Sequence, residues 1–226
     1  MNNKMTVLSG LILSSAALLS APTWAEGGHH FGKEATYEVT LTNLTPGQPI
    51  APLMVTTHRS GRSFFQAGEA PSEELAMLAE AGNGLPMAEK LREMPYFSAA
   101  EVGSGGTRPG LSSTVTITGH VRDHLSLGAM LGNTNDAFVA LSDVDLPKRG
   151  ETLTYLAPAY DAGSETNDEF CASVPGPACG GEALSPQDSG EGFVTIHNGI
   201  HGIGGLDAAL YDWRNPVAKV VIKRVQ

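Results

Sequence analysis

The feature that most constrains the fold is a two-residue alternation of apolar and polar side chains, repeated in short runs along the chain. In TYEVTLT (36–42), Tyr37, Val39 and Leu41 alternate with threonines and a glutamate. Because successive side chains of a β-strand point to opposite faces, this alternation predicts a strand with one buried face. Comparable runs occupy 53–58, 114–121, 125–131, 138–144, 152–158, 193–197 and 217–225. The sequence therefore predicts about eight strands.

The segments between these runs are rich in turn-forming residues. The chain of 226 residues contains 27 Gly and 14 Pro, and only 17% of its residues are charged. Most of the connections are too short for the helical crossovers that parallel strands need, so we expect an antiparallel arrangement. The predicted fold class is all-β, an antiparallel β-sandwich of about eight strands.

Two short helices are predicted as an insertion between the second and third strands. Ser72 followed by two glutamates is a typical helix start, and Gly82 can end that helix. A second helix is expected from Pro86, which the first helical turn tolerates, up to Pro95.

The first 25 residues have the pattern of a secretory signal peptide. Lys4 precedes an apolar run from Val7 to Leu19, and the segment ends in Thr23-Trp24-Ala25. The apolar run is shorter than the roughly 20 residues that span a bilayer. We therefore expect a cleaved signal at 1–25, a flexible lead-in at 26–34 and one domain over 35–226, in a periplasmic or secreted protein. No later segment is expected to cross a membrane.

The two cysteines are interpreted in the light of export. Cys171 and Cys179 bracket ASVPGPA, a segment that its prolines and glycine allow to turn back. An oxidising compartment favours a disulfide between them. The alternative, a metal-binding pair, is disfavoured because zinc sites use closer spacing and further ligands.

The charge of the chain limits the classes of partner. Its formal net charge is −10, which argues against nucleic acid or an anionic membrane surface. Basic ligands and divalent cations are compatible with this charge.

Acidic side chains are concentrated in one predicted loop, YDAGSETNDEF (160–170). It holds Asp161, Glu165, Asp168 and Glu169, with Asn167 among them. Carboxylates this close repel one another, and a divalent cation such as calcium relieves the repulsion. A second turn, GNTNDAF (132–138), offers further oxygen donors from its asparagines and Asp136. The alternative is that both segments are ordinary solvated turns, and the sequence does not establish that they are adjacent.

Enzyme motifs are weak. The chain has no G-x-S-x-G elbow and no phosphate-binding glycine loop, and we predict that it is not an enzyme. His197 and His201 have the spacing of some metal-binding pairs, but they lie in glycine-rich HNGIHGIGG. The alternative function is therefore a periplasmic transition-metal-dependent enzyme or metal handler that uses His197 and His201. His197 is also a candidate for contacting the acidic loop.

Five ordered segments resemble bacterial members of the spondin N-terminal domain family. They are TNDAFVAL (134–141), YDAGSETNDE (160–169), PGPACGG (175–181), GEGFVTIHNGIHG (190–202) and DWRNPVAKVVI (212–222). The resemblance covers roughly residues 35–226. It implies an extracellular antiparallel β-sandwich with one divalent cation, usually proposed to be calcium, at one end. In animal relatives such domains serve adhesion and recognition of matrix or microbial surface components.

The resemblance also implies ligands for the cation. Asp136 matches the family's Asp before the FV strand, and Asp161 matches the Asp of its D-A-G loop. The family's third ligand, a Glu on an earlier strand, has no counterpart in TVTITGH (114–120), so Glu165 or Asp168 is the candidate replacement.

The predicted function is a secreted or periplasmic, non-enzymatic binding or adhesion-type module. Its predicted calcium site comprises Asp136, Asp161, Glu165 and Asp168, and its partner is an extracellular or envelope protein or glycan. A structural envelope component that needs no metal is a further alternative.

Overall fold

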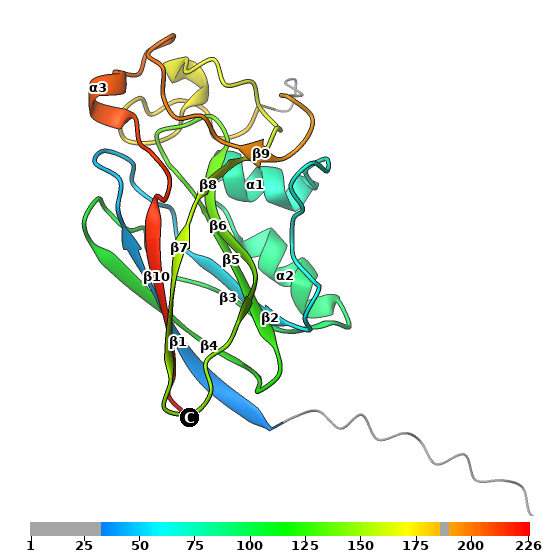
Figure 1. The fold of residues 1–226 in the computed structure, drawn as a ribbon. Coiled ribbons are helices and arrows are strands. Elements are labelled where there is room, and N and C mark those ends of the chain that lie inside the picture. Colours follow the sequence, from blue (N-terminus) through cyan, green and yellow to red (C-terminus); the bar gives the residue numbers. More distant parts are fainter. Residues whose placement is uncertain (1–32, 186–189) are drawn as a thin grey trace, which may run out of the picture. The chain divides into compact units, whose positions relative to one another are not determined.

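A computed structural model describes residues 33–185 and 190–226, which belong to one compact unit. The predicted signal peptide (1–25) and most of the predicted lead-in (26–34) lie outside the described residues. The described residues form ten strands in two antiparallel sheets, together with three short α-helices (Figure 1). The predicted all-β sandwich is confirmed.

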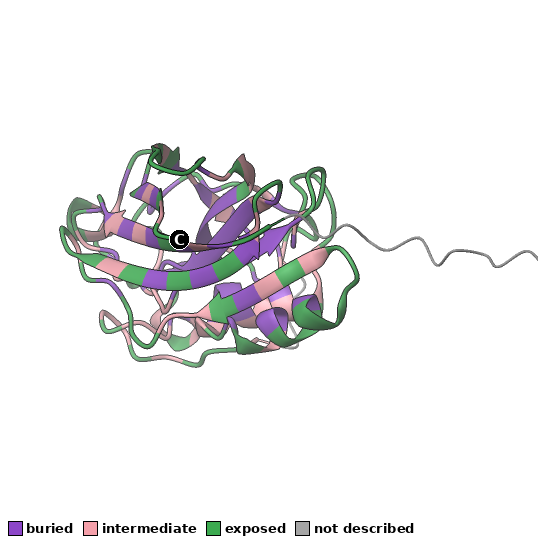
Figure 2. Ribbon diagram, turned by 90° about the horizontal axis from the view of Figure 1, so that it is seen from below, coloured by how far each residue is buried: buried purple, intermediate pink, exposed green. Residues whose placement is uncertain are grey.

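The first sheet has four strands in the order β4-β1-β10-β7. Its strands are β1 (Glu34–Asn43), β4 (Ser112–His120), β7 (Thr152–Ala157) and β10 (Ala218–Arg224). Val39 of β1 pairs with Val115 on one side and with Ile222 on the other, so the buried rows of three strands are aligned. Figure 2 shows successive strand residues switching between buried and exposed, which is the alternation that the sequence contains.

The second sheet has six strands in the order β3-β2-β5-β6-β8-β9. Its strands are β3 (Phe97–Val102), β2 (Met54–His58), β5 (His124–Met130), β6 (Ala137–Asp145), β8 (Ala159–Asp161) and β9 (Thr195–Ile196). One of its faces packs on the first sheet, where Leu127 joins the core around Leu41. The other face packs on helices, where Phe138 joins a second core with Leu78. This sheet is covered on both faces, and every residue of β2 is therefore buried.

The helices that cover the second sheet are α1 (Glu73–Ala81) and α2 (Leu85–Glu93), as predicted. The Ser72 side chain accepts a hydrogen bond from the Leu75 amide at 3.3 Å, and Gly82 ends α1 with a positive φ of 62°. Both helices lie on the same side of the second sheet in Figure 1. The short α3 (Ala208–Tyr211) was not predicted.

The strand predictions differ from the structure at the edges of the second sheet. β3 and β8 were missed, and the strand predicted at 193–197 is reduced to the two residues of β9. β3 is an edge strand with a single buried residue, Ala100, so it carries no apolar alternation.

In the described part of the chain, no helix is long and apolar enough to cross a membrane.

Long connections gather at one end of the sandwich. The β5–β6 turn, the segment between β8 and β9, and the segment containing α3 all lie at the end where β8 and β9 are labelled in Figure 1. Most of the candidate functional residues belong to these connections.

Candidate cation site

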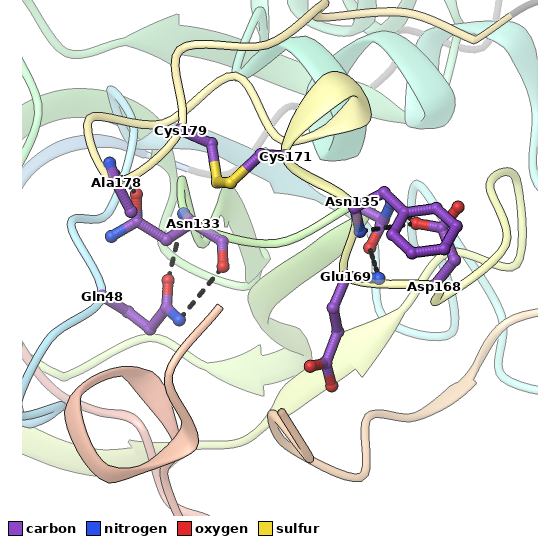
Figure 3. Close-up of a disulfide and its surroundings, with 9 residues drawn as sticks. Gln48, Asn133, Asn135, Asp168, Glu169, Cys171, Ala178 and Cys179 are labelled. Carbon is purple, nitrogen blue, oxygen red and sulfur yellow. Dashed lines mark hydrogen bonds between the residues drawn. A yellow bond between two sulfur atoms is a disulfide. The ribbon is translucent and has the colours of Figure 1, made fainter. Parts of the chain in front are cut away.

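Two asparagines join the turn at 132–138 to neighbouring segments: Asn135 to the acidic loop and Asn133 to the segment closed by the disulfide. The Asn135 side chain donates to the Asp168 carboxylate at 3.2 Å and accepts a hydrogen bond from the Glu169 amide at 3.2 Å (Figure 3). The Asn133 side chain accepts a hydrogen bond from the Ala178 amide at 3.0 Å. The turn at 132–136 and the loop at 160–170 are therefore adjacent, and these asparagine side chains organise the loops.

The disulfide between Cys171 and Cys179 is confirmed. It closes the segment that follows the acidic loop, beside the same turn (Figure 3). Gln48 fastens that turn from the opposite side, because its side chain accepts from the Asn133 amide at 3.0 Å and donates to the Asn133 carbonyl at 3.3 Å.

Asp136 lies at the centre of this region and is fully buried, with 0% of its surface exposed. Its Oδ2 accepts hydrogen bonds from the backbone amides of Ser164 at 2.8 Å and Glu165 at 3.1 Å. Its Oδ1 is buried and has no hydrogen-bond partner among the described residues. Burial, reinforced by the negative charge of Asp161, raises the pKa of Asp136 to about 8.

Asp161 is the neighbouring carboxylate, at the end of β8. Its Oδ1 accepts a hydrogen bond from the Gly163 amide at 2.7 Å, and its Oδ2 accepts one from the Asn167 side chain at 2.5 Å. Burial, followed by the charge of Glu191, raises the pKa of Asp161 to about 6. Both aspartates are thus placed where negative charge is unfavourable unless a positive charge is nearby.

Glu191 was not predicted as a site residue. The Asn167 side chain donates to its Oε1 at 3.3 Å, and its charge raises the pKa values of both Asp136 and Asp161. In the sequence it is a single acid between two glycines, with no apolar alternation around it. Only the fold, which places the β8–β9 connection over the site, reveals its position.

His197 contacts the acidic loop, as predicted. Its Nδ1 accepts a hydrogen bond from the Gly199 amide at 3.0 Å, so Nε2 carries the proton and donates to Asn167 Oδ1 at 3.0 Å. Burial lowers the pKa of His197 to about 4. The neutral ring packs on Trp213, with ring centroids 5.0 Å apart. Both ring nitrogens are engaged, so His197 positions Asn167 and has no lone pair facing a ligand.

The other two predicted ligands point elsewhere. Glu165 gives its backbone amide to Asp136, while its Oε1 accepts a hydrogen bond from the Ser185 hydroxyl at 2.6 Å. The Asp168 carboxylate bonds to Asn135 and to the Phe170 amide. Both side chains therefore support the loops around Asp136 and Asp161.

A cavity of about 270 Å³ opens beside Asp161. Asp161, Asn167, Glu191, His197 and His201 all line it. His201 is more than half exposed, and its Nδ1 lies 3.8 Å from Glu169 Oε1. Glu169 also accepts hydrogen bonds from the His201 amide at 2.6 Å and the Ile203 amide at 3.0 Å, which hold the backbone at 201–203 against Glu169. Three carboxylates, those of Asp161, Glu169 and Glu191, therefore line the cavity.

The donor set fits a hard cation. Within residues 33–185 and 190–226, no three His, Cys, Asp or Glu side chains are arranged so that they could hold a metal ion by themselves. Calcium also takes amide and backbone carbonyl oxygens and water. The unpartnered Asp136 Oδ1 is the observation that fits a cation, with Asp161 and Glu191 as neighbouring carboxylates. A bound cation there would supply the positive charge that both buried aspartates lack.

Comparison of the sequence with models of known protein families and with curated proteins found no match. The resemblance to the spondin N-terminal domain family stays a prediction from the segments quoted above.

Proposed function

We propose that this chain is a secreted or periplasmic, non-enzymatic binding module whose loop end is organised by one calcium ion. Asp136 and Asp161 hold the ion, and Glu191 adds a negative charge beside them. The partner is an extracellular or envelope protein or glycan, recognised by the loops that the ion orders. The spondin-like segments and the disulfide are compatible with this role outside the cytoplasm.

One observation carries the proposal. A fully buried carboxylate oxygen of Asp136 lacks any hydrogen-bond partner among the described residues, next to a second buried aspartate. Leaving a buried acceptor unsatisfied costs about 1–3 kcal/mol. A cation that coordinates Oδ1 removes this cost and the repulsion between Asp136 and Asp161 at once.

The chemistry of the donors favours calcium over a transition metal. The candidate ligand atoms are carboxylate oxygens of Asp136, Asp161 and Glu191, which calcium prefers, whereas zinc and copper sites use histidine nitrogen or thiolate sulfur. Both nitrogens of His197 are used in hydrogen bonds within the loops, and both cysteines are in the disulfide.

The test is a thermal melt of residues 26–226, treated with a chelator, with and without added calcium. A ligand that binds only the folded state stabilises it by about 2.7 kcal/mol at a hundredfold excess over Kd, so calcium should raise the melting temperature. Asp136→Asn and Asp161→Asn should lose this response, Glu191→Gln should weaken it, and Asp168→Asn should affect it least.

Asp145→Asn is the matched control, because the Asp145 side chain is 78% exposed and Asp145 is the last residue of β6, at the strand end opposite to Ala137. It should respond to calcium like the wild type. An unchanged melt in millimolar calcium, together with wild-type behaviour of Asp161→Ala, would refute the proposal. Stoichiometric copper or zinc in the purified protein, lost in His197→Ala, would support the alternative metal-handling function instead.

A further inference from the structure

A second cavity, of about 540 Å³, lies on the other face of β8. Neighbouring residues of a strand point to opposite faces, so Tyr160 and Asp161 face away from each other. Tyr160 pairs with Phe138, a member of the core beneath the helices, whereas Asp161 pairs with Ala137 of the inter-sheet core. The cavity around Tyr160 is therefore distinct from the cation site.

One side of this cavity is aromatic. The rings of Phe65 and Tyr160 lie 4.9 Å apart, edge to face, and both line the cavity. Phe138 supports them from below, 5.1 Å from the Phe65 ring and 5.7 Å from the Tyr160 ring. The two exposed ring surfaces thus have fixed orientations.

The remaining side is polar and offers both donors and acceptors. Arg62, Gln66 and Ser142 line it. The exposed Gln66 side chain and the Tyr160 hydroxyl make no hydrogen bond within the described residues, so they are available to a ligand. The Arg62 guanidinium stacks on the Tyr96 ring, with its carbon 4.3 Å from the ring centroid, and this contact fixes the orientation of the Arg62 side chain.

The loop that carries these side chains is held in place without a ligand. The Gly61 amide donates to Asp143 Oδ2 at 2.9 Å, and the Ser142 hydroxyl lies 2.8 Å from the Ser63 hydroxyl. Further along, the Gly68 amide donates to the Val194 carbonyl at 2.7 Å. A cavity formed before binding avoids the ordering cost that weakens recognition by mobile loops.

These features select one class of ligand. An organic cation is disfavoured, because Asp143, the one carboxylate among the described residues that line the cavity, has its Oδ2 bonded to the Gly61 amide and its Oδ1 buried. A purely apolar ligand would leave the polar half unpaired. A neutral ring with hydroxyl groups uses both halves, since its C–H face packs on aromatic rings while its hydroxyls bond to mixed donors and acceptors. We infer that this cavity binds a saccharide unit through Tyr160, Phe65, Gln66 and Arg62.

The experiment is a titration of ¹⁵N-labelled residues 26–226 with methyl glycosides of glucose, galactose and N-acetylglucosamine, and with the corresponding disaccharides. At least one should shift the amide resonances of residues 61–67, 142–143 and 160. Tyr160→Leu should weaken binding about tenfold by removing an aromatic contact. Gln66→Ala should weaken it by about threefold to tenfold, since one hydrogen bond is lost.

Phe170→Ala is the matched control, because Phe170 is an aromatic residue 57% exposed outside this cavity, and its binding should equal that of the wild type. The inference is wrong if no saccharide shifts these resonances, if tetramethylammonium or indole binds there in their place, or if Tyr160→Leu and Gln66→Ala bind like the wild type. The titration is run with calcium and with chelator. Calcium binding without saccharide binding refutes only this inference, and the converse refutes only the cation site.

Discussion

At the scale of single residues, Asp136 is a carboxylate that the fold buries with only one of its two oxygens hydrogen-bonded. Its Oδ2 is satisfied by two backbone amides of the acidic loop, and its Oδ1 is satisfied by nothing in the described residues. The aspartate therefore fixes the loop with one oxygen, while the described residues supply no partner for the other. Asn167, bonded to Asp161, Glu191 and His197, keeps the neighbouring oxygens in place around it.

The raised pKa of Asp136 predicts how the cation-free protein responds to pH. The carboxyl has a pKa of about 8 in the folded protein and an ordinary value of 3.8. The folded state thus binds more protons than the unfolded state between these values, so stability falls as the pH rises towards 8. Histidines such as His197, whose pKa is lowered, act in the opposite direction but only below pH about 6.5.

The informative window is therefore pH 6.5 to 8, in chelator. Chemical denaturation should show a free energy of unfolding that decreases across this window in the wild type and much less in Asp136→Asn. Calcium should abolish most of this decrease in the free energy of unfolding, because it neutralises the ionised carboxylates of Asp136 and Asp161. Equal slopes for the wild type and Asp136→Asn would show that Asp136 is not protonated in the folded protein.

Gly163 is the second position where one residue decides the local structure. It has a positive φ of 69°, and a Cβ there would overlap the Phe193 carbonyl oxygen. Gly163→Ala should therefore destabilise the protein by about 1–3 kcal/mol and weaken calcium binding, because its amide orients Asp161. Gly150→Ala is the control, since Gly150 has a φ of 84° but nothing within 4 Å of the added Cβ. Equal losses in denaturant midpoint for the two variants would show that the strain of a positive φ alone causes the destabilisation, without a contribution from the overlap with Phe193.

At the scale of elements, the sequence contains enough to predict the sandwich but not its edges. The inner strands carry an alternation set by burial on one face, as in β1, or a continuous apolar run set by burial on both, as in β6. β3 and β8 carry neither pattern because their positions are determined by pairing with β2 and β6. Likewise, the sequence predicts those site residues that adjoin recognisable strands and misses the one that does not. Asp136 directly precedes β6 and Asp161 is the last residue of β8, and both were predicted, whereas Glu191 reaches them only through the long β8–β9 connection.

The disulfide belongs to this scale because it closes one loop beside the site. Crosslinking so short a segment stabilises a protein by about 2–3 kcal/mol in the chain-entropy model. Replacing both cysteines, Cys171→Ser with Cys179→Ser, should lower the free energy of unfolding by about that amount. A reductant should lower the wild type to the same value and leave the double variant unchanged. If the wild-type protein were fully reduced and its free energy of unfolding did not change, this expectation would be contradicted.

At the scale of the whole molecule, the sheets and the loop end are stabilised by different interactions. The sheets are held by antiparallel strand pairing and by two apolar cores, one that includes Tyr37 and one that includes Met87 of α2. The loop end is held by side-chain hydrogen bonds, two buried aspartates and the disulfide. This division predicts that a bound cation stabilises the loop end more than it stabilises the sheets.

Hydrogen exchange should separate the two parts. The amides of Gly163, Ser164 and Glu165 donate to Asp161 or Asp136, so a cation held by these aspartates should slow their exchange strongly. The β6–β7 turn at 146–151 lies at the opposite end and opens by its own local fluctuations. Its exchange should not change with calcium. Strand amides that exchange through global unfolding should all slow by one common factor, equal to the stability gained. If the turn at 146–151 slowed as much as Ser164 and Glu165, calcium would be acting on the molecule without binding at the loop end.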